Sequence, residues 1–276
     1  MDADVLEVSR KIKEIRARNE SQGVSSWLEK RRKREKEERE KKNLNELCCV
    51  DADSGFSDFE VNNVSVKEIG VYFRDLENHL IRHIYQASYV FGAVAWLTSE
   101  KILDAMAKTR YGAQIVVQKE DFLRPDLYQH WDNTEWKKHL RKKYDSIKNS
   151  MYRFSFEGLI SHLSVACDPE MSSVRCVGNY NSDKKPAFPR MHNKFLLFAH
   201  ITSEGNAWGG TVKPYAVWTG SFNFTKNATY SLENALYIVN EQIVDAYFKE
   251  YSQILALSEP LDWEHEWVEP EYRIGT

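Results

Sequence analysis

The sequence lacks the features that would place the protein in a membrane or in an oxidising compartment. No stretch of its 276 residues approaches the roughly 20 consecutive apolar residues of a membrane-spanning helix. The first residues are acidic and have neither the basic nor the apolar region of a signal peptide. Only four cysteines are present, without C-x-x-C spacing, namely Cys48, Cys49, Cys167 and Cys176. We therefore expect a cytoplasmic protein with reduced thiols, no metal site and no cofactor.

Apolar and charged residues are abundant, and they lie in different parts of the chain. An apolar content of 42% is sufficient for the core of one sizeable domain. The formal net charge of −3 averages over an uneven distribution, with bases concentrated at 30–42 and acids at 259–271. We expect four regions: a charged helical segment at 1–45, a linker at 46–64, a main domain at 65–258 and an acidic aromatic tail at 259–276.

The N-terminal segment has the pattern of charged helices. Residues 29–42 contain nine bases and five acids interleaved at helical distances, which is typical of a solvated helix stabilised by ion pairs. The alternative is a basic arm that contacts phosphates. A narrow apolar stripe in residues 5–19 predicts packing on the main domain or on a protein partner.

The main domain begins with the pattern of an α/β fold. Residues 66–86 have apolar positions at helical spacing, and the continuous apolar run 89–96 predicts a strand buried on both faces. A helix through Lys108 and a second strand at 113–117 complete a βαβ unit. These patterns predict a mixed sheet flanked by helices. His79 and His83 lie four residues apart in the first helix, and we expect surface histidines there.

Two basic stretches follow this unit. Residues 134–150 predict a basic helix, which is either a solvated face or a nucleic-acid patch. The polar loop 180–190 carries Lys184, Lys185 and Arg190 and leads directly to His192. These three cations are candidate binding residues for a polyanionic substrate. The aromatic tail either covers a neighbouring surface or mimics nucleic acid.

A histidine and a lysine precede an apolar strand in the last third of the chain. The run 195–199 is too short and bulky to favour a helix, and alternation along a strand puts His192 and Lys194 on one face, about 7 Å apart. An imidazole can attack or move a proton, and an ammonium can hold negative charge. This pair suits an anionic substrate.

Two later stretches add donors and a carboxylate. After the apolar run 215–218, Gly220 lets the backbone approach a ligand closely, and Ser221 and Asn223 offer hydrogen-bond donors. Glu233 lies at the start of a further predicted strand. Together these side chains are typical of a phosphate site with a nucleophile.

The three stretches resemble the signature of the phospholipase D superfamily, which is H-x-K, then a G-S-x-N-x-T turn, then a segment with Glu. The corresponding residues are His192, Lys194, Gly220, Ser221, Asn223, Thr225, Glu233 and Asn234. The resemblance covers residues 70–258. It implies a phospholipase D-like α/β fold and a metal-independent phosphodiesterase that acts through a phosphohistidine.

The resemblance also implies a role for each residue. His192 would be the nucleophile, Lys194 and Asn223 would hold phosphoryl oxygens, and Ser221 would be a supporting donor. Glu233 would orient the imidazole, while Gly220 and Thr225 would shape the substrate-binding turn. The family usually has Asp five residues after the Lys, where this chain has Ala199. The glycine-containing stretch 201–214 is expected to be an inserted loop beside the site.

The chain contains one half of the family's two-histidine site. Of its eight histidines, only His192 is followed by Lys two residues later. The resemblance therefore implies a homodimer with two His192 residues facing across a two-fold axis. The basic loop favours an endonuclease cleaving DNA or RNA, and the alternatives are a phospholipase D-type lipid hydrolase or a catalytically inactive nucleic-acid-binding or assembly protein.

Overall fold

The computed structural model describes residues 29–30, 33, 64–124, 135–150, 155–156, 172–180, 190–202 and 210–267. The chain divides into two compact units, Met1–Asn43 and Leu44–Thr276. Residues 29, 30 and 33 are helical, in agreement with the expected charged helix. The rest of the predicted N-terminal segment, most of the linker, and Cys48, Cys49, Cys167, Lys184 and Lys185 lie outside the described residues.

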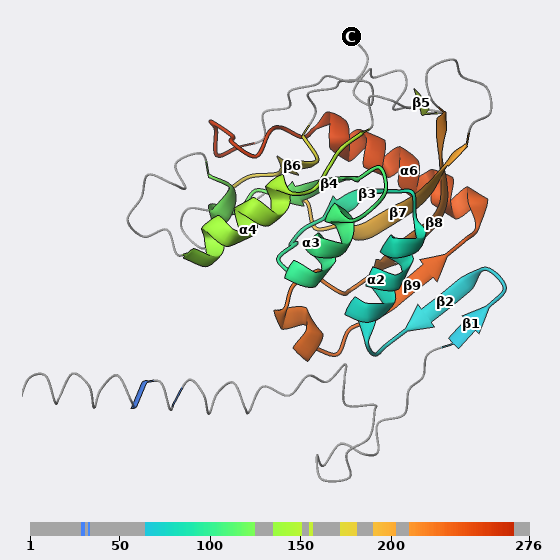
Figure 1. Ribbon diagram of the computed structural model, residues 1–276, viewed down its shortest axis with the longest axis horizontal. Helices are drawn as coiled ribbons and strands as arrows, with labels where there is room; N and C mark the ends of the chain where they lie inside the picture. The colour runs from blue at the N-terminus through green and yellow to red at the C-terminus, as the bar shows by residue number, and fades with distance from the viewer. Residues whose placement is uncertain are drawn as a thin grey trace, which may run out of the picture. The chain divides into compact units, whose positions relative to one another are not determined.

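A mixed sheet of nine strands forms the centre of the described part of the second unit (Figure 1). Three strands are parallel to one another: β3 (Tyr89–Val94), β4 (Ala113–Gln118) and β6 (Val174–Val177). On the other side of β3 the sheet continues with antiparallel pairs through β7 (Lys194–Thr202), β8 (Thr211–Gly220), β9 (Ala235–Ile238), β2 (Ile69–Tyr72) and β1 (Val64–Val66). The short β5 (Ser155–Phe156) pairs with the start of β8.

Helices cover both faces of this sheet (Figure 1). One face carries α2 (Leu76–Gln86), α3 (Glu100–Ala107) and α4 (Glu135–Asp145), and the other carries α6 (Glu241–Ala256). Two short 3₁₀ turns, η2 (Asp121–Leu123) and η5 (Asn227–Tyr230), follow β4 and β8. The side chains of Ser99 and Asn240 accept hydrogen bonds from the third residue beyond them and so begin α3 and α6. The predicted mixed sheet flanked by helices is confirmed.

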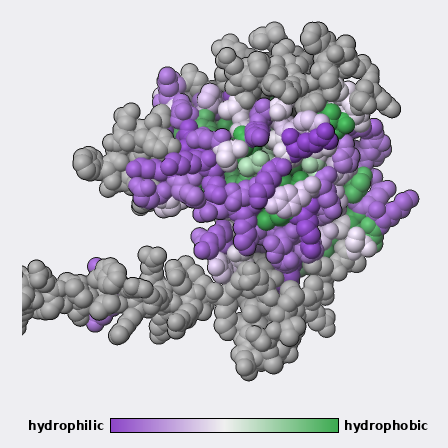
Figure 2. Space-filling view, viewed as in Figure 1, coloured by the Kyte–Doolittle hydropathy of each residue, from purple (hydrophilic) through white to green (hydrophobic). Residues whose placement is uncertain are grey.

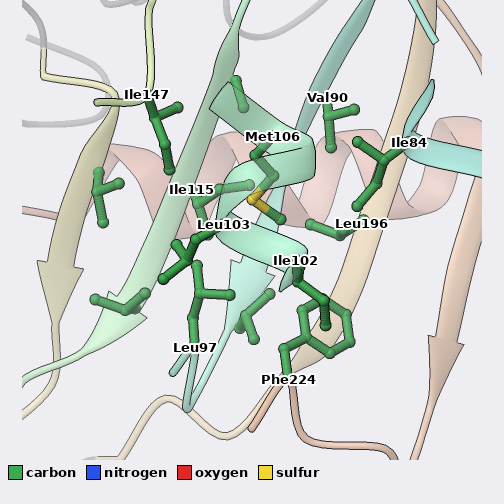
Figure 3. Packing of buried hydrophobic residues seen from close by; sticks show 14 of the residues in the cluster. Ile84, Val90, Leu97, Ile102, Leu103, Met106, Ile115, Ile147, Leu196 and Phe224 are labelled. Carbon is green, nitrogen blue, oxygen red and sulfur yellow. The ribbon is translucent and has the colours of Figure 1, made fainter. Parts of the chain in front are cut away.

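The apolar pattern of the sequence produces two core layers, one on each face of the sheet. Figure 3 shows the layer under α3, where Ile102 and Met106 pack over Val90, Ile115 and Leu196 of the sheet. All six residues of β3 are buried, as its continuous apolar run predicted, and all six of β4 are buried as well. Each fully buried aliphatic side chain of this kind contributes about 1.5–3 kcal/mol. These central strands therefore form a rigid support for the residues at their ends.

The predicted helix at 66–86 is wrong in its first half, up to Asp75. Residues 64–72 form the hairpin β1–β2, and the helix begins only at Leu76, after Asp75 in a left-handed conformation with φ 55°. The reason is tertiary, because β2 pairs with β9, where Ile69 lies opposite Ile238. Local periodicity contains no information about a partner strand that lies about 170 residues away in the sequence.

The predicted inserted loop at 201–214 is also shorter than expected. β7 continues to Thr202 and β8 begins at Thr211, with Ile201 opposite Val212 and Thr202 opposite Thr211. Glycines favoured the loop interpretation, but the flanking residues alternate and pair across the hairpin. The structure therefore places strand, not loop, on both sides of residues 203–209.

The start of the acidic aromatic tail packs on its own domain. Glu259 exchanges two backbone hydrogen bonds with Cys176 of β6, at 3.0 and 2.9 Å. The buried ammonium of Lys119 forms an ion pair with the Glu259 carboxylate and donates to the backbone oxygens of His265 (2.9 Å) and Trp267 (2.6 Å). As far as Trp267, the tail thus covers a surface of the same domain.

Much of the charge on the predicted basic helix is paired within the domain. Arg141 is buried and binds Asp262 at 2.6 Å, and Lys143 binds Asp104 at 2.6 Å. Lys142 and Lys148 remain exposed. Figure 2 shows that the face carrying α2, α3 and α4 is mainly hydrophilic over its described elements. None of the helices described is long and apolar enough to span a bilayer.

Candidate active site

The strand directions bring the three sequence motifs to one edge of the sheet. β3, β4 and β8 end at this edge, while β7 and β9 begin there, because Val94 lies opposite Lys194 and Gly220 opposite Ala235. The segments that continue from these ends are 95–99, 119–120, 190–193, 221–225 and 231–234. Ligand sites in open α/β sheets are typically found where strands end in this way.

His192 and Lys194 are in contact at this edge. The Lys194 ammonium lies 3.2 Å from Nδ1 and 3.3 Å from Nε2 of His192, and it donates to the His192 backbone oxygen at 3.0 Å. The imidazole is exposed and the lysine half-buried. Partial burial and the positive charges of Lys194 and Arg190 lower the pKa of His192. Each of these effects favours the neutral form of the imidazole.

The backbone on both sides of His192 is fixed by the neighbouring strands. The Met191 amide donates to the side-chain oxygen of Gln118 at 2.8 Å, and that side chain donates to the Asn179 backbone oxygen at 2.8 Å. The Ala95 amide donates to the Asn193 backbone oxygen, also at 2.8 Å. A residue clamped on both sides presents its side chain from a defined position.

The turn after β8 holds Ser221 against Glu233. The Ser221 hydroxyl donates to the Glu233 carboxylate and accepts from the Asn234 amide at 3.1 Å. Gly220 is required here because a Cβ atom would lie 2.3 Å from the Asn234 backbone oxygen. The Glu233 charge raises the pKa of Lys194 and opposes the larger lowering caused by burial. In this arrangement the carboxylate acts on Ser221 and Lys194.

Asn223 and Thr225 complete the turn. Asn223 is half-buried, and its Oδ1 is buried without a hydrogen-bond partner in the described part of the chain. The Phe224 backbone oxygen accepts from the amides of Thr98 and Ser99, both at 2.9 Å, which joins the turn to the segment after β3. The Thr225 hydroxyl accepts from the Ala228 amide at 3.2 Å and so stabilises the start of η5.

Two further residues at this edge were not predicted from the sequence. Trp96 lies edge-on to the His192 ring, with centroids 5.1 Å apart, and its Nε1 donates to Glu120 at 2.6 Å. Burial raises the pKa of Glu120, while the Trp96 hydrogen bond and Arg190 oppose that rise. Each residue lies two positions after the end of a buried parallel strand. This position in the sequence is the feature from which both could have been predicted as site residues. Arg190 is exposed near these groups.

His79 and His83 are not surface histidines. Both are half-buried, and the His83 ring stacks on Tyr237 with centroids 3.8 Å apart and an interplanar angle of 8°. Burial lowers the pKa of His83 to about 4. The helix turns this face toward the sheet, where Trp218 and Phe198 also contact the ring. No cluster of three potential metal ligands occurs among the residues that the structure describes.

The chain is 34% identical over 214 residues to the uncharacterized protein L381 of Acanthamoeba polyphaga mimivirus, a match that covers 73% of this chain and 70% of that protein. The chain belongs to the family of this mimivirus protein. No family model matches the sequence.

Among solved structures, this chain is similar to Nuc from Salmonella typhimurium, a phospholipase D family member. The TM-score is 0.41 at 15% identity, covering 69% of this chain and 95% of Nuc. NucT from Helicobacter pylori has a TM-score of 0.40 at 15% identity, covering 68% of this chain and 95% of NucT. Phosphatidylserine synthase of Haemophilus influenzae has a TM-score of 0.36 at 14% identity, covering 74% of this chain and 43% of the synthase.

The phospholipase D resemblance of the sequence corresponds to a three-dimensional arrangement. The three motifs lie between residues 192 and 234, and the sheet brings them to a single edge. The predicted relationship to the phospholipase D superfamily rests on these motifs.

Proposed function

We propose that the protein is a phosphodiesterase, and specifically an endonuclease, that uses His192 as its nucleophile. The observation that carries this proposal is the direct contact between the His192 imidazole and the Lys194 ammonium, beside the Ser221–Glu233 pair. A neutral imidazole next to a fixed positive charge is suited to attack the phosphorus of an anionic ester.

The reaction proceeds in two displacements. His192 attacks phosphorus, so that a P–N bond forms and the P–O bond to the leaving group breaks. His192 of the partner subunit protonates the departing oxygen. The same partner imidazole then removes a proton from water, which attacks phosphorus and breaks the P–N bond. The net change is the addition of one water molecule across one phosphodiester.

The other residues stabilise charge rather than form bonds. Lys194 and the Asn223 amide hold the phosphoryl oxygens as negative charge develops. Glu233 keeps Lys194 charged and orients the Ser221 hydroxyl through the observed hydrogen bond. Because the lysine supplies the positive charge, we expect cleavage to continue in a strong chelator.

Nucleic acid is the substrate class favoured by the cations near the site. Arg190 lies next to His192, and its charge lowers the pKa of that imidazole. Lys184 and Lys185 precede it in the same stretch of sequence. A repeating phosphate backbone is bound by such a row of cations, and binding of this kind weakens strongly as the salt concentration rises.

The test is cleavage of labelled single- and double-stranded DNA and RNA in the presence of a chelator. We expect His192→Ala to reduce the rate by at least ~10³-fold. His200→Ala is the matched control, because His200 is exposed and lies toward the far end of β7, the strand that begins just after His192. Cleavage that is equal in wild type and His192→Ala would refute the proposed nucleophile, and hydrolysis of phospholipid vesicles alone would refute the nuclease assignment.

A further inference from the structure

Trp96 lies between the proposed nucleophile and a half-buried carboxylate. Its indole contacts the His192 ring in an edge-to-face arrangement with an interplanar angle of 79°. The indole Nε1 donates to Oε1 of Glu120 at 2.6 Å. The Lys194 ammonium lies 5.9 Å from the centroid of the same indole ring. One aromatic side chain therefore contacts both members of the His–Lys pair.

The carboxylate that holds this indole comes from a rigid part of the chain. Glu120 follows β4 directly, after Lys119, whose side chain is completely buried. The Lys119 amide donates to the Val177 backbone oxygen at 3.0 Å, and the Leu123 amide donates to the Glu120 backbone oxygen at 2.9 Å. The backbone of Glu120 is thus fixed on both sides, and its side chain is a fixed acceptor for the indole.

The imidazole of His192, in contrast, is largely exposed. Its backbone is clamped, but rotation about its side-chain bonds is limited chiefly by the groups that contact the ring. Among the described residues, these groups include the Lys194 ammonium and the Trp96 indole. A flexible ammonium gives little steric restraint, whereas an anchored indole blocks part of the volume that the ring would otherwise sweep.

We propose that Glu120 is a positioning residue for His192 and acts through the Trp96 indole. The hydrogen bond from Trp96 to Glu120 fixes the indole, and the indole fixes the rotamer of the attacking imidazole. This inference rests on the proposed function for its catalytic meaning, but the geometric claim is testable without substrate. Glu120 and Trp96 touch neither phosphorus nor the leaving group in this scheme.

The test compares Glu120→Ala, Glu120→Gln and Trp96→Phe. Glutamine retains an oxygen that accepts from the indole, alanine removes it, and phenylalanine removes the donor. We expect kcat to fall roughly ten- to a hundredfold in Glu120→Ala and Trp96→Phe, with KM changed little, and Glu120→Gln to retain most of the rate. Glu135→Gln and Trp136→Phe are matched controls, because both residues are exposed on α4.

The second readout is the NMR signal of the His192 ring proton, assigned with His192→Ala. The indole edge contact shifts this signal, so we expect a clear change in Glu120→Ala and a nearly wild-type position in Glu120→Gln. This readout stands even if the wild type cleaves none of the nucleic acids tested, a result that would count against the proposed function alone. The positioning role is refuted if Glu120→Ala leaves both kcat and the His192 signal at the values of Glu120→Gln. If Glu120→Ala does not fold, a Trp96→Phe variant with wild-type kcat and His192 pKa also refutes this role.

Discussion

The ammonium nitrogen of Lys194 lies 3.2 Å from Nδ1 of His192 and 3.0 Å from the backbone oxygen of the same residue. His192 and Lys194 are two residues apart in sequence, and their side chains are in direct contact where β7 begins. Partial burial and the lysine charge both oppose protonation of the imidazole, and the pKa of His192 is lowered. The lysine thus acts on the charge state of the imidazole beside it.

The first prediction concerns this coupling. Because a nearby cation disfavours the imidazolium, Lys194→Met should raise the pKa of His192. The acidic limb of the rate profile should move to higher pH, and kcat should fall about 10²–10³-fold from the loss of phosphoryl stabilisation. NMR titration of the His192 ring measures the pKa directly. Lys213→Met, an exposed position toward the other end of the β7–β8 hairpin, should leave it unchanged.

The second prediction concerns the close backbone approach at Gly220. A Cβ atom at this position would meet the Asn234 backbone oxygen at 2.3 Å, so Gly220→Ala must displace the turn that carries Ser221. We expect the cleavage rate to fall roughly ten- to a hundredfold. Gly70→Ala is the control, because the nearest atoms there belong to the Tyr72 side chain and not to the backbone. Equal rates in the two variants would contradict the requirement for this turn.

The third prediction concerns the buried ion pair between Lys119 and Glu259. The Lys119 side chain is completely buried and that of Glu259 is 8% exposed, so Lys119→Met leaves a buried carboxylate without its partner. Urea unfolding should show a loss of about 3–5 kcal/mol. Adding Glu259→Gln to Lys119→Met should restore part of the lost stability, because the buried carboxylate charge is then removed. The exposed pair of Lys249 and Asp245 provides a control, and Lys249→Met should cost about 1 kcal/mol or less.

The fourth prediction concerns the proposed dimer. Leu232 is 55% exposed next to Glu233, at the sheet edge where two His192 residues would have to meet. Leu232→Glu should weaken self-association about tenfold or more, as measured by sedimentation, and cleavage should fall with the dimer fraction. Leu257→Glu is the control with the same change of side chain, because Leu257 is 44% exposed just after α6. A wild-type protein that cleaves as a monomer at all concentrations would overturn the two-chain site.

The sequence was informative about those features that a short, local pattern of residues predicts. The continuous apolar run of β3 predicted a strand buried on both faces, and the stretch 113–117 was predicted to be the strand that forms β4. The motif residues were found because glycine, histidine and lysine at fixed spacing have few purely structural explanations. His192, Lys194, Ser221 and Glu233 do meet at one edge.

The wrong predictions have a common physical cause. Each concerns a residue whose structure depends on a partner that is distant in sequence. Residues 64–72 contain helical periodicity, yet β2 forms because β9 satisfies its backbone groups. Ile201 and Thr202 were predicted to lie in a loop, although they pair with Val212 and Thr211. His83 was predicted to be exposed, but the sheet provides Tyr237 as a stacking partner.

The sequence by itself determined which reactive groups stand in the motifs, because side-chain type and short spacing specify an imidazole, an ammonium, a hydroxyl and a carboxylate there. It also determined the α/β class, since burial on both faces of a strand requires a continuous apolar run. Only the tertiary structure decided that Glu233 bonds to Ser221, that Lys119 is buried under the chain's own tail, and that Trp96 joins Glu120 to His192. Those contacts join segments separated by up to about 150 residues, and the order of strands in the sheet alone brings them together.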